Sequence, residues 1–154
     1  MAAADQPPPR TNVVDGSSAI EPILVAATLL AVAEAVEPLA SVRRLTLLAP
    51  SGDLRLKARV DARLLGQVLA ALLGAAIHHS SAGGLVRMRL DRRGDRVGIE
   101  IEHQERVPPG ATGAPDADTT AAVQAMGGSL ERVAGHAAGH AAGHCQRLEL
   151  PAAP

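Results

Sequence analysis

The sequence of 154 residues contains no phenylalanine, tyrosine or tryptophan. Its core must therefore consist of leucine, valine, isoleucine, alanine and methionine, which bury less apolar surface per side chain than aromatic rings do, so we expect modest stability. The same absence removes the aromatic platforms on which nucleic-acid bases stack. Because the net charge is only −1, the chain also lacks the excess of basic residues that attracts nucleic acid or an anionic membrane. Both observations argue against nucleic-acid binding.

Cysteine is scarce as well, since Cys145 is the only one. A single cysteine excludes an internal disulfide and suits a reducing compartment. The N-terminal MAAADQPPPR has no basic region followed by an apolar region, so no signal peptide is expected. The longest apolar run, residues 23–33, is shorter than the roughly 20 residues that span a bilayer. The sequence predicts a cytoplasmic protein without membrane insertion.

The length and the 47% apolar composition predict one folded domain. We expect an Ala/Pro-rich disordered tail over residues 1–11, a domain over 12–151 with a low-complexity Gly-His-Ala loop at 134–145, and a tail at 152–154. Ser18 and Glu21 have the spacing of a capping box, which predicts a helix over 19–37 that Pro38 ends.

Two strands should follow, over residues 42–48 and 54–60, the second with alternating apolar and basic side chains. Asp61 then fits the N-cap of a helix that ends near His79. On a helical wheel QVLAALLGAAIHHS separates into a broad apolar arc and a nearly bare opposite side. The bare side consists of Gln67, Ala71, Gly74, Ala75 and His78.

The clearest hairpin runs from Val86 to Glu102, with the turn at DRRGD. A register that pairs Leu90 with Val97 also pairs Met88 with Ile99 and Arg87 with Glu100, so core pairs and charge pairs agree. A turn-rich loop, a helix over residues 119–126 and strands over 129–133 and 146–150 complete the chain. This order predicts an α/β (α+β) fold, a two-layer sandwich with a mixed sheet and its helices on one face.

The stretch DARLLGQVLAALLGAAIHHS resembles the conserved helix of the ATPase domain of sensor histidine kinases, which has the Bergerat fold. Similarity extends to VEPLASVRRLTLL, to the hairpin, and to AVQAMGGSLERV with CQRLELP, in the family's order and over about residues 12–151. The resemblance implies a Bergerat-type fold and a role in two-component signalling.

The departures from that family concern its nucleotide site. In the family two asparagines of this helix face the nucleotide, the second of which holds Mg²⁺, and a nearby lysine contacts phosphate; Ala71, Ala75 and His78 stand there, while Gln67 is kept. Neither alanine offers an oxygen to Mg²⁺, which demands near-ideal octahedral oxygen ligation. The resemblance thus implies a lost metal site.

The family's adenine-binding aspartate is replaced by His103, and two glycines that follow it are replaced by Glu105 and Val107. In the next glycine motif only Gly113 remains. Asp116 falls where a helix should open, and its carboxylate would repel phosphate. The segment of the mobile ATP lid is reduced to PPG. We therefore expect no bound cofactor, with ATP and Mg²⁺ as the alternative.

Plainer interpretations stand beside this one. Ala71 and Ala75 are also ordinary residues for a helix contact, and His78 and His79 suit the C-terminal end of a helix, where the macrodipole favours them. His136, His140 and His144 recur every four residues with Cys145 adjacent, a spacing that on a helix could hold Zn²⁺. Because glycines interrupt this tract, a loop between two strands is the alternative.

Three functional hypotheses result. The first is a degenerate ATPase domain that binds a histidine kinase or response regulator as an interaction module, without enzymatic activity. The second is an active or partner-completed ATP-binding kinase or ATPase domain, which the fold alone does not exclude. The third is metal binding through the histidine tract.

Overall fold

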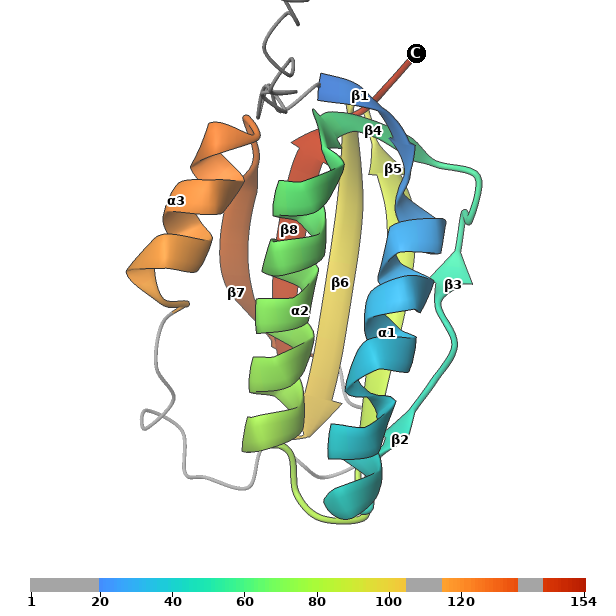
Figure 1. The fold of residues 1–154 in the computed structure, drawn as a ribbon, viewed down its shortest axis with the longest axis vertical. Helices are drawn as coiled ribbons and strands as arrows, with labels where there is room; N and C mark the ends of the chain where they lie inside the picture. Colours follow the sequence, from blue (N-terminus) through green and yellow to red (C-terminus); the bar gives the residue numbers. More distant parts are fainter. Residues whose placement is uncertain (1–19, 105–114, 136–142) are drawn as a thin grey trace, which may run out of the picture.

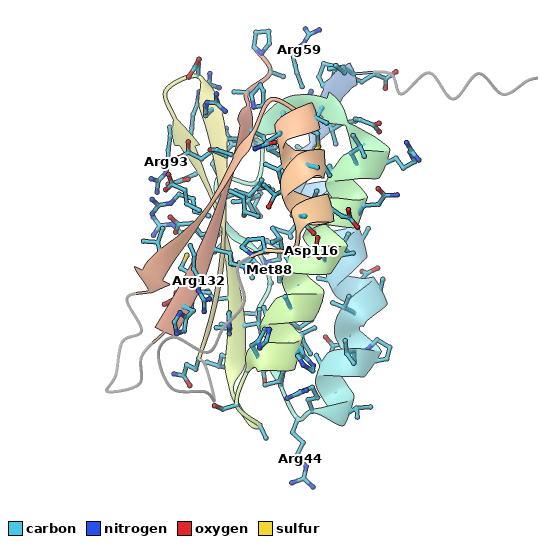
Figure 2. The ribbon with its side chains drawn as sticks, turned by 90° about the vertical axis from the view of Figure 1, so that its left-hand side faces the viewer. Arg44, Arg59, Met88, Arg93, Asp116 and Arg132 are labelled. Atoms are coloured by element: carbon cyan, nitrogen blue, oxygen red, sulfur yellow. The ribbon has the colours of Figure 1, made fainter. Side chains whose placement is uncertain are left out.

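The computed structural model describes residues 20–104, 115–135 and 143–154. In this part of the chain, three helices cover one face of a six-stranded mixed sheet, as Figures 1 and 2 show from two sides. The elements are β1 (Ile20–Leu24), α1 (Val25–Val42), β2 (Thr46–Leu47), β3 (Ser51–Gly52), β4 (Lys57–Asp61), α2 (Ala62–His79), β5 (Leu85–Arg93), β6 (Arg96–Gln104), α3 (Ala117–Ala125), β7 (Ser129–Gly135) and β8 (Gly143–Pro151). The expected two-layer architecture is confirmed.

The sheet has the order β2-β5-β6-β8-β7, and β3 also pairs with β5. The strands β2 and β3 run parallel to β5, whereas the pairs β5–β6, β6–β8 and β7–β8 are antiparallel. A separate antiparallel ribbon of β1 and β4 lies at one end of the helix layer (Figure 1).

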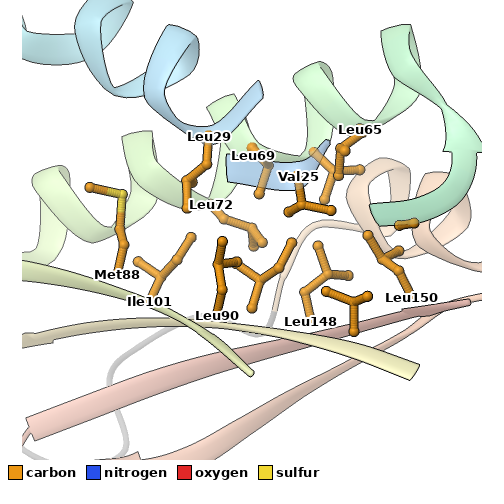
Figure 3. Packing of buried hydrophobic residues seen from close by; sticks show 14 of the residues in the cluster. Val25, Leu29, Leu65, Leu69, Leu72, Met88, Leu90, Ile101, Leu148 and Leu150 are labelled. Atoms are coloured by element: carbon orange, nitrogen blue, oxygen red, sulfur yellow. The ribbon is translucent and has the colours of Figure 1, made fainter. Parts of the chain in front are cut away.

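Leucine, isoleucine and valine side chains from both layers fill the core, as Figure 3 shows. The inner face of α2 supplies Leu65, Val68, Leu69, Leu72, Leu73, Ala76 and Ile77, all buried. Asp61 begins this helix as its N-cap, because its Oδ1 accepts hydrogen bonds from the N–H groups of Arg63 (2.8 Å) and Leu64 (3.4 Å). The apolar arc and the cap predicted for this helix are confirmed.

The first helix differs from the expectation at both ends. Residues 20–24 form β1 instead of the first helical turns, and they pair with β4, where Ile23 lies opposite Ala58. Pro22 favours this outcome, because the residue before a proline is pushed towards extended conformations. At the other end Pro38 lies inside α1, which continues to Val42. Ala40 is fully buried against Leu45 and Ile77, and this packing offsets the backbone hydrogen bond that Pro38 removes.

The two strands expected over residues 42–48 and 54–60 are shorter in the structure. Val42 ends α1, residues 43–45 form the connection that follows it, and of residues 42–48 only Thr46 and Leu47 pair with β5. In β4 the predicted alternation is confirmed, because Ala58 and Val60 are buried while Lys57 and Arg59 are exposed.

The predicted hairpin register was wrong by two residues. Leu90 lies opposite Ile99, Met88 opposite Ile101 and Arg89 opposite Glu100. Gly94 and Asp95 form a two-residue turn in which Gly94 has φ +63°, and this tight turn sets the register. A slip of two residues leaves every side chain on its expected face, so the hydrophobic alternation did not distinguish the two alignments.

The C-terminal strands are longer than expected. Residues 134–135 and 143–145 belong to β7 and β8 rather than to a loop, and residues 136–142 lie outside the described part. The N–H of Ala152 donates to Asp95 O (2.9 Å) and that of Ala153 to Lys57 O (2.8 Å). Residues 152 and 153 are therefore attached to the fold and do not form the expected tail. The tail expected over residues 1–11 lies outside the described residues.

Candidate functional site

The bare side of α2 is open in the structure. Ala71 and His78 are exposed and Ala75 is half-buried. A Cβ placed on Gly74 would meet no atom within 4 Å among the described residues. This part of α2 therefore offers a smooth surface without oxygen ligands.

A pocket of about 130 Å³ lies between α2 and α3, the two helices that stand side by side in Figure 1. Its lining consists of Gln67, Val68, Asp118, Thr119 and Ala122. Of the predicted site residues that the structure describes, only Gln67 lines this pocket, while Ala71, Ala75 and His78 lie further along α2. The lining residues from α3 were not predicted, because they become neighbours of Gln67 only through the packing of α3 on α2.

The N-terminus of α3 carries two carboxylates. Asp116 is its N-cap, and Asp116 Oδ1 accepts a hydrogen bond of 2.6 Å from the N–H of Thr119. Hydrogen bonds from Thr119 hold the pKa of Asp116 below its usual range, so this carboxylate is ionised at neutral pH. Asp118 follows in the first turn and lines the pocket. Because a bound phosphate would meet these negative charges, this helix end is a poor anion site.

His103 is the last buried residue along β6, and it is 4% exposed. It lies opposite His144 of β8, with 6.2 Å between the ring centroids. On the far side of His144, Arg132 Nη2 is 3.1 Å from His144 Nδ1. Since a guanidinium only donates hydrogen bonds, Nδ1 accepts and the proton of a neutral His144 lies on Nε2. Where the resembling family has a carboxylate, this sheet end thus has two imidazoles and a guanidinium.

Arg132 was not among the predicted site residues. Figure 2 shows it on the lower half of the closing strands, and its proximity to His144 depends on the register that pairs Arg132 with Gln146. The two strands predicted over residues 129–133 and 146–150 are separated by a low-complexity segment, so their sequence did not define this register. Had alternation been followed along a longer closing hairpin, it could have indicated that Arg132 and His144 are neighbours.

The ligand set of His136, His140, His144 and Cys145 stays a prediction, but the strand geometry separates two of its members. His144 and Cys145 are consecutive residues of β8, so their side chains point to opposite faces of the sheet. Burial, and then Glu100 and Glu102, raise the pKa of the Cys145 thiol to about 11, which disfavours the thiolate that binds metals. His136, His140 and Gly113 lie outside the described residues. Within the part that the structure describes, no group of three or more His, Cys, Asp or Glu could hold a metal ion.

Comparison with family models and with curated proteins finds no match. Solved structures do match. The mycobacterial sensor histidine kinase MprB is 21% identical, with a TM-score of 0.70 over 87% of this chain and 99% of that one. A nucleotide-free catalytic domain of the histidine kinase ThkA is 13% identical, with a TM-score of 0.71 over 87% and 97%. The cytoplasmic segment of the histidine kinase QseC is 13% identical, with a TM-score of 0.70 over 91% and 83%. Over most of its length the chain therefore has the fold of a histidine kinase ATPase domain.

Proposed function

We propose that this chain is a degenerate histidine kinase-like ATPase domain that binds neither ATP nor Mg²⁺ and serves as a cytoplasmic protein-interaction module in two-component signalling. Its partner in this proposal is a histidine kinase or a response regulator. The fold supports the two-component context, and the composition of the site supports the loss of nucleotide binding.

The observation that carries the proposal is the bare face of α2. Where the resembling family presents two asparagine side chains, Ala71 and Ala75 present methyl groups on an open surface. An alanine methyl group coordinates no cation, and Mg²⁺ needs several oxygen ligands in a near-octahedral arrangement. The methyl groups instead suit contact with another apolar surface.

Two further groups oppose nucleotide binding. His103 stands where the family's aspartate accepts a hydrogen bond from adenine, and an imidazole lacks the two acceptor oxygens and the negative charge of that carboxylate. The carboxylates of Asp116 and Asp118 repel phosphate at the N-terminus of α3. Together with the alanines of α2, these groups come from three different elements, so a single substitution does not restore the site.

Titration with ATP and with a fluorescent ATP analogue tests the nucleotide part, with and without Mg²⁺ and up to millimolar nucleotide. We expect no saturable binding, whereas the catalytic domain of an active histidine kinase should bind under the same conditions. Saturable, Mg²⁺-dependent binding by this chain would favour the active or partner-completed ATPase instead.

The interaction part needs a separate measurement. Purified cytoplasmic segments of histidine kinases and response regulators from the same genome should be tested for binding to this chain by calorimetry. Variants with Ala71→Arg and Ala75→Arg should weaken the complex if the bare face of α2 is the contact. A complex of unchanged affinity would place the contact elsewhere.

A further inference from the structure

A second concave surface lies between α1 and the outer edge of the sheet, at the segment that carries β2 (Figure 1). Its volume is about 200 Å³, and we call it the α1 groove. The apolar lining includes Leu30, Ala33, Leu47 and Met88, and the rim carries Glu34 and Glu37. Residues 48–50 complete the wall.

The floor of the α1 groove is fixed by the core. Met88 is 1% exposed and rises from β5 towards the helices (Figure 3). Leu47 is half-buried and belongs to β2, which among the described strands has β5 as its only neighbour in the sheet order. The opposite edge of β2 is therefore unpaired among the described residues. The groove thus has a rigid apolar base beside an open strand edge.

The helical wall of the α1 groove is apolar and acidic. Leu30 lines the groove and is 44% exposed. The helix α1 contains no Lys or Arg. Glu34 and Glu37 are three residues apart, so their side chains lie on the same side of the helix. Both are exposed, and neither forms an ion pair with a described residue. Two like charges in this spacing repel each other, and a cation placed between them would relieve that repulsion.

We propose that the α1 groove binds a short segment of a partner protein in which apolar side chains alternate with basic ones. An apolar side chain contacts Leu30, Ala33 and Leu47 above the buried Met88, and an arginine or lysine extends its aliphatic part over Leu30 to reach Glu34 and Glu37. The volume lies below the range of about 300 to 1,000 Å³ that is typical of small-molecule sites, and it suits one or two side chains. The inference rests on the proposed function only in that the ligand is a protein.

A symmetric pairing of two copies through α1 fits the α1 groove less well than a basic segment does. An α1 helix from another molecule would bring its own Glu34 and Glu37 and no basic side chain. Charge repulsion therefore disfavours that pairing, and the sedimentation test below covers contacts through other elements of a second copy.

The binding test uses ¹⁵N-labelled full chain and the peptide acetyl-Gly-Arg-Leu-Ala-Arg-Leu-Gly-amide in an NMR titration. A matched peptide has glutamate in place of both arginines. We expect the arginine peptide to shift the amide signals of α1 and of residues 46–49 with a Kd of about 1 mM or lower, and the glutamate peptide to cause no such shifts. Equal effects of both peptides, no binding, or shifts on another surface would overturn the proposal.

A charge-reversal variant tests the rim. The double substitution Glu34→Lys and Glu37→Lys should weaken binding of the arginine peptide about tenfold or more. The matched control is Glu21→Lys with Glu131→Lys, two exposed residues outside the groove lining, which changes the net charge equally. This control should bind the arginine peptide with the original affinity. If both variants lost the same affinity, net charge alone would explain the effect, and the proposed site would be wrong.

Two further measurements distinguish other occupants of the groove. The first is sedimentation of the chain alone. If a second copy occupies the groove, the chain associates as its concentration rises, and the Glu34→Lys and Glu37→Lys variant changes that association. The second measurement deletes residues 1–11. If the deletion shifts the α1 signals and tightens peptide binding, the N-terminal segment of this chain occupies the groove. Either result would overturn the assignment to a partner. Because the groove is separate from the bare face of α2, ATP binding would contradict the proposed function without affecting this test.

Discussion

His144 and Cys145 are neighbours on β8, yet their side chains lie on opposite faces of the sheet. His144 lies opposite His103, whose side chain is buried on the same side of β6 as Ile99 and Ile101. Cys145 lies between Glu102 of β6 and Val133 of β7. Because side chains alternate along a strand, one ion cannot be ligated by both residues.

This geometry predicts that Cys145 contributes nothing to metal binding by the histidine tract. The variant Cys145→Ser should show the same change in melting temperature with Zn²⁺ or Ni²⁺ as the unaltered chain. The matched variant replaces His136, His140 and His144 with alanine, and it should lose any such change. A thermal shift that disappears in Cys145→Ser alone would contradict the strand geometry.

The Cys145 thiol should react slowly at neutral pH. Its pKa is raised from 9.0 to about 11, first by burial and then by Glu100 and Glu102, so its thiolate fraction at pH 7 is about 100-fold lower than that of an unperturbed thiol. Alkylation by iodoacetamide should be slower than in the urea-unfolded chain by at least that factor. An alkylation rate at pH 7 equal to that of the unfolded chain would contradict the burial of the thiol.

The same raised pKa has a consequence for stability. The unfolded chain releases the thiol proton at lower pH than the folded chain does, so this group's contribution is present below pH 9 and is lost as the pH rises towards 11. The free energy of unfolding, measured with urea at several pH values, should fall more steeply between pH 9 and 11 than in Cys145→Ser. Parallel pH profiles of the two proteins would refute this linkage.

Much of the fold could be predicted from the sequence because its signals are local. The apolar arc of α2, its cap Asp61 and the alternation in β4 depend on spacing along one element, and the structure confirms them. The start of α1 could not be predicted, because residues 20–24 become a strand only by pairing with β4, about 35 positions away in the chain.

The candidate site was predictable only in part, for the same reason. Its composition on α2 follows from the motif, so Gln67, Ala71 and Ala75 could be placed on one side of a helix. The pocket wall from α3 and the contact of Arg132 with His144 arise from packing between separate elements. An alternating sequence pattern also cannot distinguish two strand registers that differ by two residues. Leu90 illustrates this, because its partner in the hairpin is Ile99 and not the expected Val97.

The N-cap Asp61 should contribute measurably to stability. Replacing it with alanine removes the acceptor for the N–H groups of Arg63 and Leu64 and should lower the free energy of unfolding by about 1 kcal/mol. Asp61→Ser retains a side-chain oxygen and should lose less. Urea unfolding of the three proteins measures the difference, and equal losses in both variants would show that the cap is not the cause.

Two glycines of α2 should be replaceable with a gain in stability. A Cβ on Gly66 or Gly74 would meet no described atom within 4 Å, and glycine inside a helix costs roughly 0.5 to 1 kcal/mol relative to alanine. We therefore expect Gly66→Ala and Gly74→Ala each to raise the free energy of unfolding by about that amount.

Gly52 provides the contrasting control for these substitutions. It has φ +94°, and a Cβ there would overlap the carbonyl oxygen of Leu90, so Gly52→Ala must move the backbone of β3 or β5 and should be destabilising. Urea unfolding compares the three variants with the unaltered chain. Destabilisation by Gly74→Ala as well would indicate that another part of the chain packs on the bare face of α2, and the open surface that the proposed function requires would then be absent.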